Sequence, residues 1–296
     1  MDYIGRFAPS PTGKLHFGSL LAALSSYLDA KKNNGKWFLR IEDIDKKREM
    51  KGASENIIST LETFGFEWDG RILYQSQRLE IYQSYLDDLL SLKLIYPCGC
   101  SRKEIADSGN PHGIEGAVYL GTCRNGQKKT EKNPSWRIRV DEKPIRYIDK
   151  IQGPQEQILS RDIGDFVLKR ADNVFSYQLA VTIDDDDQGI TNIVRGADLI
   201  DSTPRQIFIQ NTLGLATPSY AHIPVATNIF GEKLSKQTLA QSLNVDNPTL
   251  HLWQAFKFLG QNVDPELTHS DLNTFWQFAI ESWEINQVPK SRSMPC

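Results

Sequence analysis

The feature that most constrains this chain is an eleven-residue string, PSPTGKLHFGS, at positions 9–19. It follows a predicted strand over residues 3–8 and leads into a predicted helix that begins near Gly18, where apolar residues recur at helical spacing. A strand that turns directly into a helix is where open α/β sheets bind nucleotides, at the carboxyl ends of their strands. The string therefore predicts an α/β fold with a nucleotide-binding edge close to the N-terminus.

Three features of the string suit phosphate binding. Gly18 lets a base or ribose approach the backbone closely, because glycine has no side chain. The amides of residues 18–21 open the helix and form an anion site. His16 can donate to a phosphate oxygen as charge develops in a transition state. Because a histidine near a helix start is common, the prediction depends on the whole string.

A second predicted phosphate element is the pair Lys233 and Lys236, which follows Gly231 in the segment GEKLSK. Two lysines in a mobile loop can close on a triphosphate and stabilise the leaving pyrophosphate. Such a pair by itself usually indicates a solvated surface. It predicts phosphate binding here because the string at 9–19 is also present.

The rest of the chain has the pattern of a parallel α/β sheet with one interruption and a helical end. Residues 96–135 lack periodicity and are predicted to form an irregular insert, and the acidic run at 184–187 is predicted to be a solvated turn. The other predicted elements are strands over 37–41 and 136–140, helices over 51–65, 77–93 and 201–213, strands or a strand–helix pair over 166–170 and 175–183, and helices after residue 239.

Charge and hydropathy argue against a membrane-spanning or secreted protein. The chain has 296 residues, a net charge of −3, and no apolar run of about 18 residues that would cross a membrane. Its start has no basic and apolar leader, so a cytoplasmic location is expected.

Residues 124–150 hold nine Lys and Arg against four Asp and Glu, a patch that suits either phosphates or solvent.

With these motifs the chain resembles the class I aminoacyl-tRNA synthetases, with residues 16–19 as the HIGH-type signature and residues 233–237 as the KMSKS-type signature. Within that class it is similar to the glutamyl group. The segments that carry this similarity are RFAPSPTG at 6–13, RIEDID at 40–45, RGADL at 195–199 and STPRQ at 202–206.

Two departures narrow the resemblance. The second signature reads KLSKQ, with Leu in place of Met and Gln in place of the final Ser. Full glutamyl synthetases usually read Gly-Glu-Asp-His where this chain has GADL at 196–199, a version that resembles the short paralogues acting on the queuosine base of tRNA(Asp). Only 59 residues follow Gln237, too few for the anticodon-binding region of the full enzymes.

The resemblance implies an α/β class I synthetase fold, with a Rossmann-type parallel sheet, a zinc-containing insert and a short C-terminal helical region. The catalytic domain is expected at 1–95 and 161–237, the second part carrying the KLSKQ loop. The insert, of the acceptor-binding type, is expected at 96–160, and a helical region without an anticodon-binding domain at 238–296. The expected oligomeric state is a monomer.

The resemblance also implies a reaction. Glutamate and ATP with Mg²⁺ would form glutamyl-adenylate without tRNA, and the glutamyl group would then pass to the queuosine base at the anticodon wobble position of tRNA(Asp). The alternatives are an ordinary glutamyl-tRNA synthetase that charges tRNA(Glu), a nucleotidyl transferase acting on another metabolite, and a non-catalytic RNA-binding paralogue. Length and the GADL string disfavour the first alternative, and the full set of glutamate and phosphate residues disfavours the others.

Glutamate has two carboxylates and one ammonium, so its site needs guanidinium or hydroxyl donors and a carboxylate. Arg6 and Arg195 suit the carboxylates and Glu42 the ammonium, unless the arginines form ordinary ion pairs. The resemblance assigns Arg6, Phe7, Ala8, Pro9, Ser10, Glu42, Tyr177 and Arg195 to glutamate, Pro9, Thr12, Gly13, His16, Gly18, Ser19 and Lys236 to ATP, and His16, Lys233 and Lys236 to catalysis.

Three cysteines in the predicted insert, Cys98, Cys100 and Cys123, suit a metal better than a disulfide because two of them are only two residues apart. A closed tetrahedral zinc site needs a fourth ligand. General chemistry favours His112, whereas the resemblance implies Tyr119 in the pattern Cys-x-Cys…Tyr-x3-Cys and a structural zinc ion. Three unrelated thiols remain the alternative, and the C-terminal cysteine has no assigned role.

Overall fold

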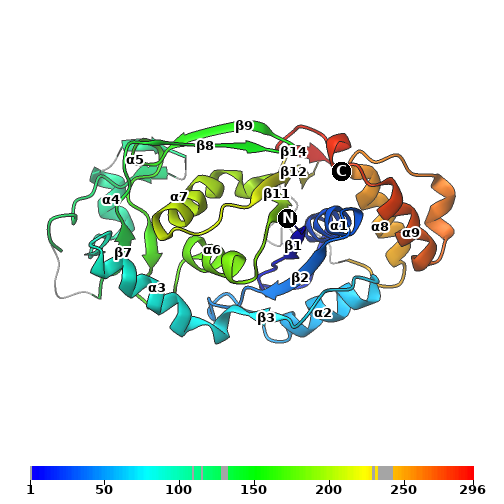
Figure 1. Ribbon diagram of the computed structural model, residues 1–296, viewed down its shortest axis with the longest axis horizontal. Helices are drawn as coiled ribbons and strands as arrows, with labels where there is room; N and C mark the ends of the chain where they lie inside the picture. The colour runs from blue at the N-terminus through cyan, green and yellow to red at the C-terminus, as the bar shows by residue number, and fades with distance from the viewer. Residues whose placement is uncertain (1, 109, 115, 128–132, 229–230, 233–242) are drawn as a thin grey trace.

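The computed structural model describes residues 2–108, 110–114, 116–127, 133–228, 231–232 and 243–296, with no description of the side chains of 110–112. The predicted lysine pair, Lys233 and Lys236, lies outside the described residues. The chain forms an elongated α/β molecule (Figure 1). The C-terminal helices lie at one end, and the described residues of 95–138, here called the cysteine-bearing segment, lie at the other.

The predicted strand–helix–strand opening is confirmed. Parallel strands β1 (Ile4–Phe7), β2 (Lys36–Ile41) and β3 (Leu73–Tyr74) form a sheet in that order. Helix α1 (Phe17–Lys32) joins the first two strands and ends before Asn34, whose φ of 52° takes the backbone out of the helix. The string at 9–19 therefore lies at the carboxyl end of β1, as expected.

A second sheet continues the first. Strands β11 (Asn192–Gly196) and β12 (Ser219–Ile223) are parallel, and β8 (Pro144–Asp149) and β9 (Gly153–Ile158) extend them as a hairpin. The amide of Thr191 donates to the carbonyl of Ile4 at 3.0 Å, so β11 runs beside β1. The hairpin was not predicted, because its weak alternation gives little sequence signal.

Helices cover these sheets. The predicted helices at 51–65, 77–93 and 201–213 correspond to α2 (Ala53–Thr63), α3 (Leu79–Ser91) and α7 (Thr203–Leu213). The ambiguous pattern at 166–183 is a strand–helix pair, β10 (Val167–Lys169) and α6 (Tyr177–Asp187).

The prediction that 184–187 is a solvated turn is wrong. Asp184 and Asp185 lie in α6 and are 0% and 2% exposed. The Arg78 Nε is 2.7 Å from Asp184 Oδ1, and the Arg40 Nη2 is 2.6 Å from Asp185 Oδ1. Arg40 on β2 and Arg78 just before α3 are far away in the sequence, and their charges offset the cost of burying the carboxylates.

The segment predicted to be irregular contains short regular elements. They are β4 (Ile95–Cys98), α4 (Arg102–Ser108), β5 (Asn110–Gly113) and β6 (Gly116–Val118), followed by β7 (Ser135–Ile138). Strands β10, β7 and β4 form an antiparallel sheet in that order, which ties this segment to the start of α6.

The C-terminal helices α8 (Pro248–Phe258) and α9 (Leu272–Ser282) pack on α1 in one apolar cluster with β1 and β2. Trp283 binds across this interface, since its indole Nε1 donates to Asp29 Oδ1 at 3.1 Å. No helix in the described part of the chain is long and apolar enough to cross a membrane.

Candidate active site

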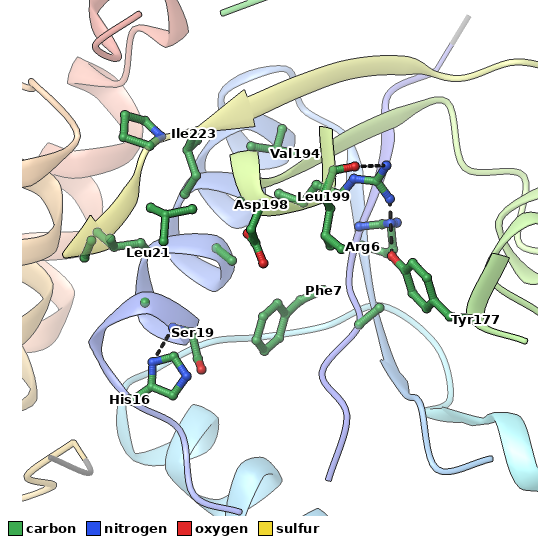
Figure 2. Close-up of a pocket in the computed structure, with 18 residues that line it drawn as sticks. Arg6, Phe7, His16, Ser19, Leu21, Tyr177, Val194, Asp198, Leu199 and Ile223 are labelled. Atoms are coloured by element: carbon green, nitrogen blue, oxygen red, sulfur yellow. Dashed lines mark hydrogen bonds between the residues drawn. The ribbon is translucent and has the colours of Figure 1, made fainter. Parts of the chain in front are cut away.

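A cavity of about 190 Å³ lies where β1 and β11 end, and Figure 2 shows side chains from both strands, α1 and α6 around it. It adjoins a larger cleft of about 1200 Å³ that extends toward the cysteine-bearing segment. Phe7, His16, Tyr177 and Asp198 line both spaces. This is the edge of the sheet at which α/β folds bind ligands.

The first turn of α1 faces the cavity. His16 is the N-cap residue, and its Nδ1 accepts a hydrogen bond from the Ser19 amide at 3.4 Å (Figure 2). A neutral imidazole that accepts at Nδ1 carries its proton on Nε2, so that atom is a donor. Together with the amides at the start of the helix, this geometry favours binding of an anion.

Two buried arginines face the same cavity from neighbouring strands. Arg6, on β1, donates through Nε to Asp185 Oδ1 at 3.1 Å, and Arg195, on β11, donates through Nη1 to the Tyr177 hydroxyl at 3.3 Å. Both arginines are 4% exposed. The two guanidinium groups place hydrogen-bond donors beside the cavity.

Glu42 provides the opposite charge in the adjoining cleft. Its carboxylate is buried just after β2, and Oε1 makes no hydrogen bond with any described residue. The nearest cation among these residues is Arg40, whose Nε is 3.8 Å away. Burial raises the pKa of Glu42 to about 7, although Arg40 and Arg6 act in the opposite direction. A buried carboxylate oxygen without a hydrogen-bond donor suits a cationic ligand.

The structure brings most of the predicted site residues together. Arg6, Phe7, Ala8, His16, Gly18, Ser19, Tyr177 and Arg195 line the small cavity, and Pro9, Ser10, Thr12 and Glu42 line the adjoining cleft. Gly13 does not line either space. It instead has a φ of 136°, a conformation that glycine adopts without strain.

Sequence reasoning missed several residues of the site. Asp198 and Leu199 line the cavity, and their place in the GADL string was the available signal. Asp185, which binds Arg6, was concealed by the assignment of the acidic run to a solvated turn. His222 contacts Arg195 from β12, and no motif pointed to it.

The three cysteine sulfurs predicted to bind a metal lie within 4.8 Å of one another. The Sγ atoms of Cys100 and Cys123 are 3.6 Å apart, close to the spacing of about 3.8 Å that tetrahedral zinc with bonds of about 2.3 Å requires. The Tyr119 hydroxyl is 3.2 Å from the sulfur of Cys98 and 3.8 Å from that of Cys100. The donor set and spacing fit a zinc ion. The side chain of His112, the alternative fourth ligand, lies outside the described residues.

Known proteins with similar sequences belong to one group of tRNA synthetases. A family model described as "tRNA synthetases class I (E and Q), catalytic domain" matches residues 4–261. A "Glutamyl-Q tRNA(Asp) synthetase" from Dechloromonas aromatica is 53% identical over 97% of this chain and 96% of its own length. A protein of the same name from Neisseria meningitidis is 51% identical over 97% of this chain and 98% of its own length.

Solved structures agree on the fold. A glutamate-tRNA synthetase from Elizabethkingia anophelis superposes with a TM-score of 0.81, covering 100% of this chain and 68% of the other, at 23% identity. A glutamate tRNA ligase from Elizabethkingia meningosepticum, solved with its amino acid, gives a TM-score of 0.80 over 100% of this chain and 67% of the other, also at 23% identity.

Proposed function

Since the chain belongs to the glutamyl-Q tRNA(Asp) synthetase family of class I tRNA synthetases, we propose that it joins glutamate to the queuosine base of tRNA(Asp). The observation that carries this proposal is the cavity itself, where two buried arginines meet the first turn of α1, with the buried carboxylate of Glu42 in the adjoining cleft. Glutamate has the complementary charges, and ATP has phosphates that suit the helix end.

In the proposed first step, a glutamate carboxylate oxygen attacks the α-phosphorus of ATP, giving glutamyl-adenylate and pyrophosphate. Arg6 and Arg195 hold the carboxylates, Glu42 holds the ammonium, and Tyr177 and Ser10 add hydroxyl donors. His16 and the α1 amides stabilise phosphate charge, as would Lys233 and Lys236. Mg²⁺ on the phosphates would neutralise charge on the leaving group. Catalysis by this set is positioning and charge stabilisation, since no protein nucleophile is required.

In the proposed second step, a hydroxyl oxygen of the queuosine cyclopentenediol attacks the acyl carbon of the adenylate, and AMP leaves. The larger cleft suits this acceptor, because it runs from Tyr177 to Arg102 and Arg137 in the cysteine-bearing segment. Of these two arginines, Arg102 is exposed, and its guanidinium suits a polyanionic nucleic acid. The activation step is proposed to need no tRNA.

We assign the zinc ion to Cys98, Cys100 and Cys123, with Tyr119 as the fourth ligand. A zinc ion bound by four protein groups has no open position for a substrate, so its role would be to hold the insert together. The proposed domain boundaries remain 1–95, 96–160, 161–237 and 238–296. A cytoplasmic monomer is the proposed form, in keeping with reduced cysteines.

The decisive experiment is transfer of labelled glutamate to tRNA(Asp) with and without queuosine. We expect label only on the queuosine-containing tRNA, released by mild alkali and absent when the diol is first oxidised with periodate. Label on tRNA(Glu) would instead indicate an ordinary glutamyl-tRNA synthetase. Absence of label together with absence of glutamate-dependent ATP–pyrophosphate exchange would favour a non-catalytic RNA-binding protein.

The raised pKa of Glu42 predicts that glutamate binding depends on pH. With its pKa raised to about 7 by burial, Glu42 is increasingly protonated below that pH and loses its attraction for an ammonium. The KM for glutamate in ATP–pyrophosphate exchange is therefore expected to rise as pH falls below 7, by up to about tenfold per unit. The variant E42Q should have a high KM with a weaker pH dependence. A wild-type KM that is constant from pH 6 to pH 8 would contradict the assignment of the ammonium to Glu42.

A further inference from the structure

Arg195 is a buried cation that forms no ion pair with any described residue. In the part of the chain that the structure describes, no carboxylate oxygen lies within 4.0 Å of its guanidinium nitrogens. Arg6 and Arg40, by contrast, both form ion pairs with Asp185. Burying a charge without a counter-ion costs free energy. A buried arginine of this kind therefore points to an anionic ligand.

Neutral groups hold the Arg195 guanidinium in place. Its Nε donates to His222 Nε2 at 3.0 Å, and its Nη2 donates to Thr203 Oγ1 at 2.8 Å and to Gln206 Oε1 at 2.9 Å. The Nη1 donates to the hydroxyl of Tyr177 at 3.3 Å, and both residues line the cavity. The guanidinium plane is thus fixed by partners that do not cancel its charge.

The contact with Arg195 determines the tautomer of His222. An arginine Nε can only donate, so His222 Nε2 must accept and the ring proton must be on Nδ1. That proton points to Asp149 Oδ2, which is 2.6 Å away. His222 is 0% exposed, and burial lowers its pKa to about 4 despite the hydrogen bond with Asp149. The imidazole is therefore neutral at physiological pH.

Asp149 is anchored by the backbone. Its Oδ1 accepts from the amides of Ile151 at 3.0 Å and Gln152 at 2.9 Å, at the turn between β8 and β9, and from the amide of His222 on β12 at 3.1 Å. Burial acts to raise the pKa of Asp149, but the hydrogen bonds from His222 and from these amides hold it below its ordinary value. The carboxylate is therefore ionised and fixed in position.

We propose that Asp149 and His222 are positioning residues that orient Arg195 toward the cavity while leaving its positive charge available to a substrate carboxylate. This inference rests on the proposed function, in which Arg195 binds glutamate. If an aspartate were paired directly with Arg195, its carboxylate would compete with the substrate carboxylate for the guanidinium. Asp149 fixes the orientation of the neutral His222 ring. The ring in turn fixes the Arg195 guanidinium without neutralising its charge.

A matched pair of variants at His222 tests the proposal. Asparagine reaches about as far as Nδ1, so H222N can still donate to Asp149 but offers no acceptor to Arg195. Glutamine reaches about as far as Nε2, so H222Q offers an amide oxygen to Arg195. For H222N we expect the KM for glutamate in ATP–pyrophosphate exchange to rise about 10-fold to 100-fold, with kcat and the KM for ATP within about threefold. For H222Q we expect a change of less than about fivefold.

Equal KM values for the two variants, or an unchanged KM in H222N, would overturn the proposal. A reference variant, R195A, separates the two hypotheses. If R195A raises the KM and H222N does not, the positioning role fails while the glutamate site stands. If R195A also leaves the KM unchanged, the proposed site itself fails.

A measurement on the wild-type protein tests the geometry without relying on the activity of a variant. Nitrogen-15 NMR of labelled histidine reports the tautomer of His222, assigned by comparison with H222Q. We expect a neutral ring with the proton on Nδ1 from pH 6 to pH 8. A proton on Nε2, or protonation of the ring within that range, would contradict the proposed geometry.

Discussion

Replacing Arg195 with alanine is expected to raise the KM for glutamate by about 30-fold to several thousand-fold, with little change in the KM for ATP. Removing one partner of a buried charge pair costs on the order of 2–5 kcal/mol. The effect should be at the upper end because Arg195 has no carboxylate partner among the described residues, so its charge is fully available to the substrate. ATP–pyrophosphate exchange at varied glutamate measures this without tRNA.

Two controls accompany this variant. R195K keeps a charge but loses the planar donors to His222, Thr203 and Gln206, so an intermediate KM is expected. R146A removes an exposed arginine paired with Glu156, and its kinetics should match the wild type. A thermal-unfolding curve for each variant separates lost binding from lost folding. A wild-type KM in a folded R195A protein would exclude Arg195 from the glutamate site.

Replacing Cys100 with serine is expected to release the bound metal and unfold the segment around it. Zinc binding in small structural sites is coupled to folding, with apparent free energies of about 10–16 kcal/mol. The small cluster of Tyr96, Cys98, Tyr119 and Cys123 has little other apolar contact to hold it. We expect the wild type to contain one zinc ion per chain by metal analysis and C100S to contain almost none.

The chain offers a matched control for this experiment. Cys296 is exposed and lies outside the cysteine cluster, so C296S should retain the full zinc content. Limited proteolysis should cleave C100S, or wild type treated with a chelator, within the segment 96–135 before it cleaves the catalytic sheet. A metal-free wild-type protein would instead indicate three unrelated thiols.

Residues that are close in the sequence could be assigned correctly without a structure. The string at 9–19 determined the β1–α1 turn, because two prolines, a glycine and a helical apolar stripe restrict the local backbone. The cysteine cluster was recognisable because Cys98 and Cys100 are separated by one residue. Arg6, His16 and Glu42 lie at the ends of elements that were predicted correctly, so their meeting at one edge of the sheet followed from parallel strand order.

Errors arose where long-range contacts override local pattern. A run of four aspartates normally prefers water, yet Asp184 and Asp185 are buried because Arg40 and Arg78 lie against them. The β8–β9 hairpin has weak alternation and depends on pairing with β12 for its place in the sheet.

The sequence by itself determined the class of fold, the edge at which a nucleotide would bind, and the residue types that suit glutamate. These depend on local backbone preference and on motifs a few residues long. Only the tertiary structure decided how Arg195 is held. His222 and Asp149 are 73 residues apart and belong to no motif, and they meet because β12 pairs with β8. Local sequence contains no information on such a contact, because it exists only after the sheet has assembled.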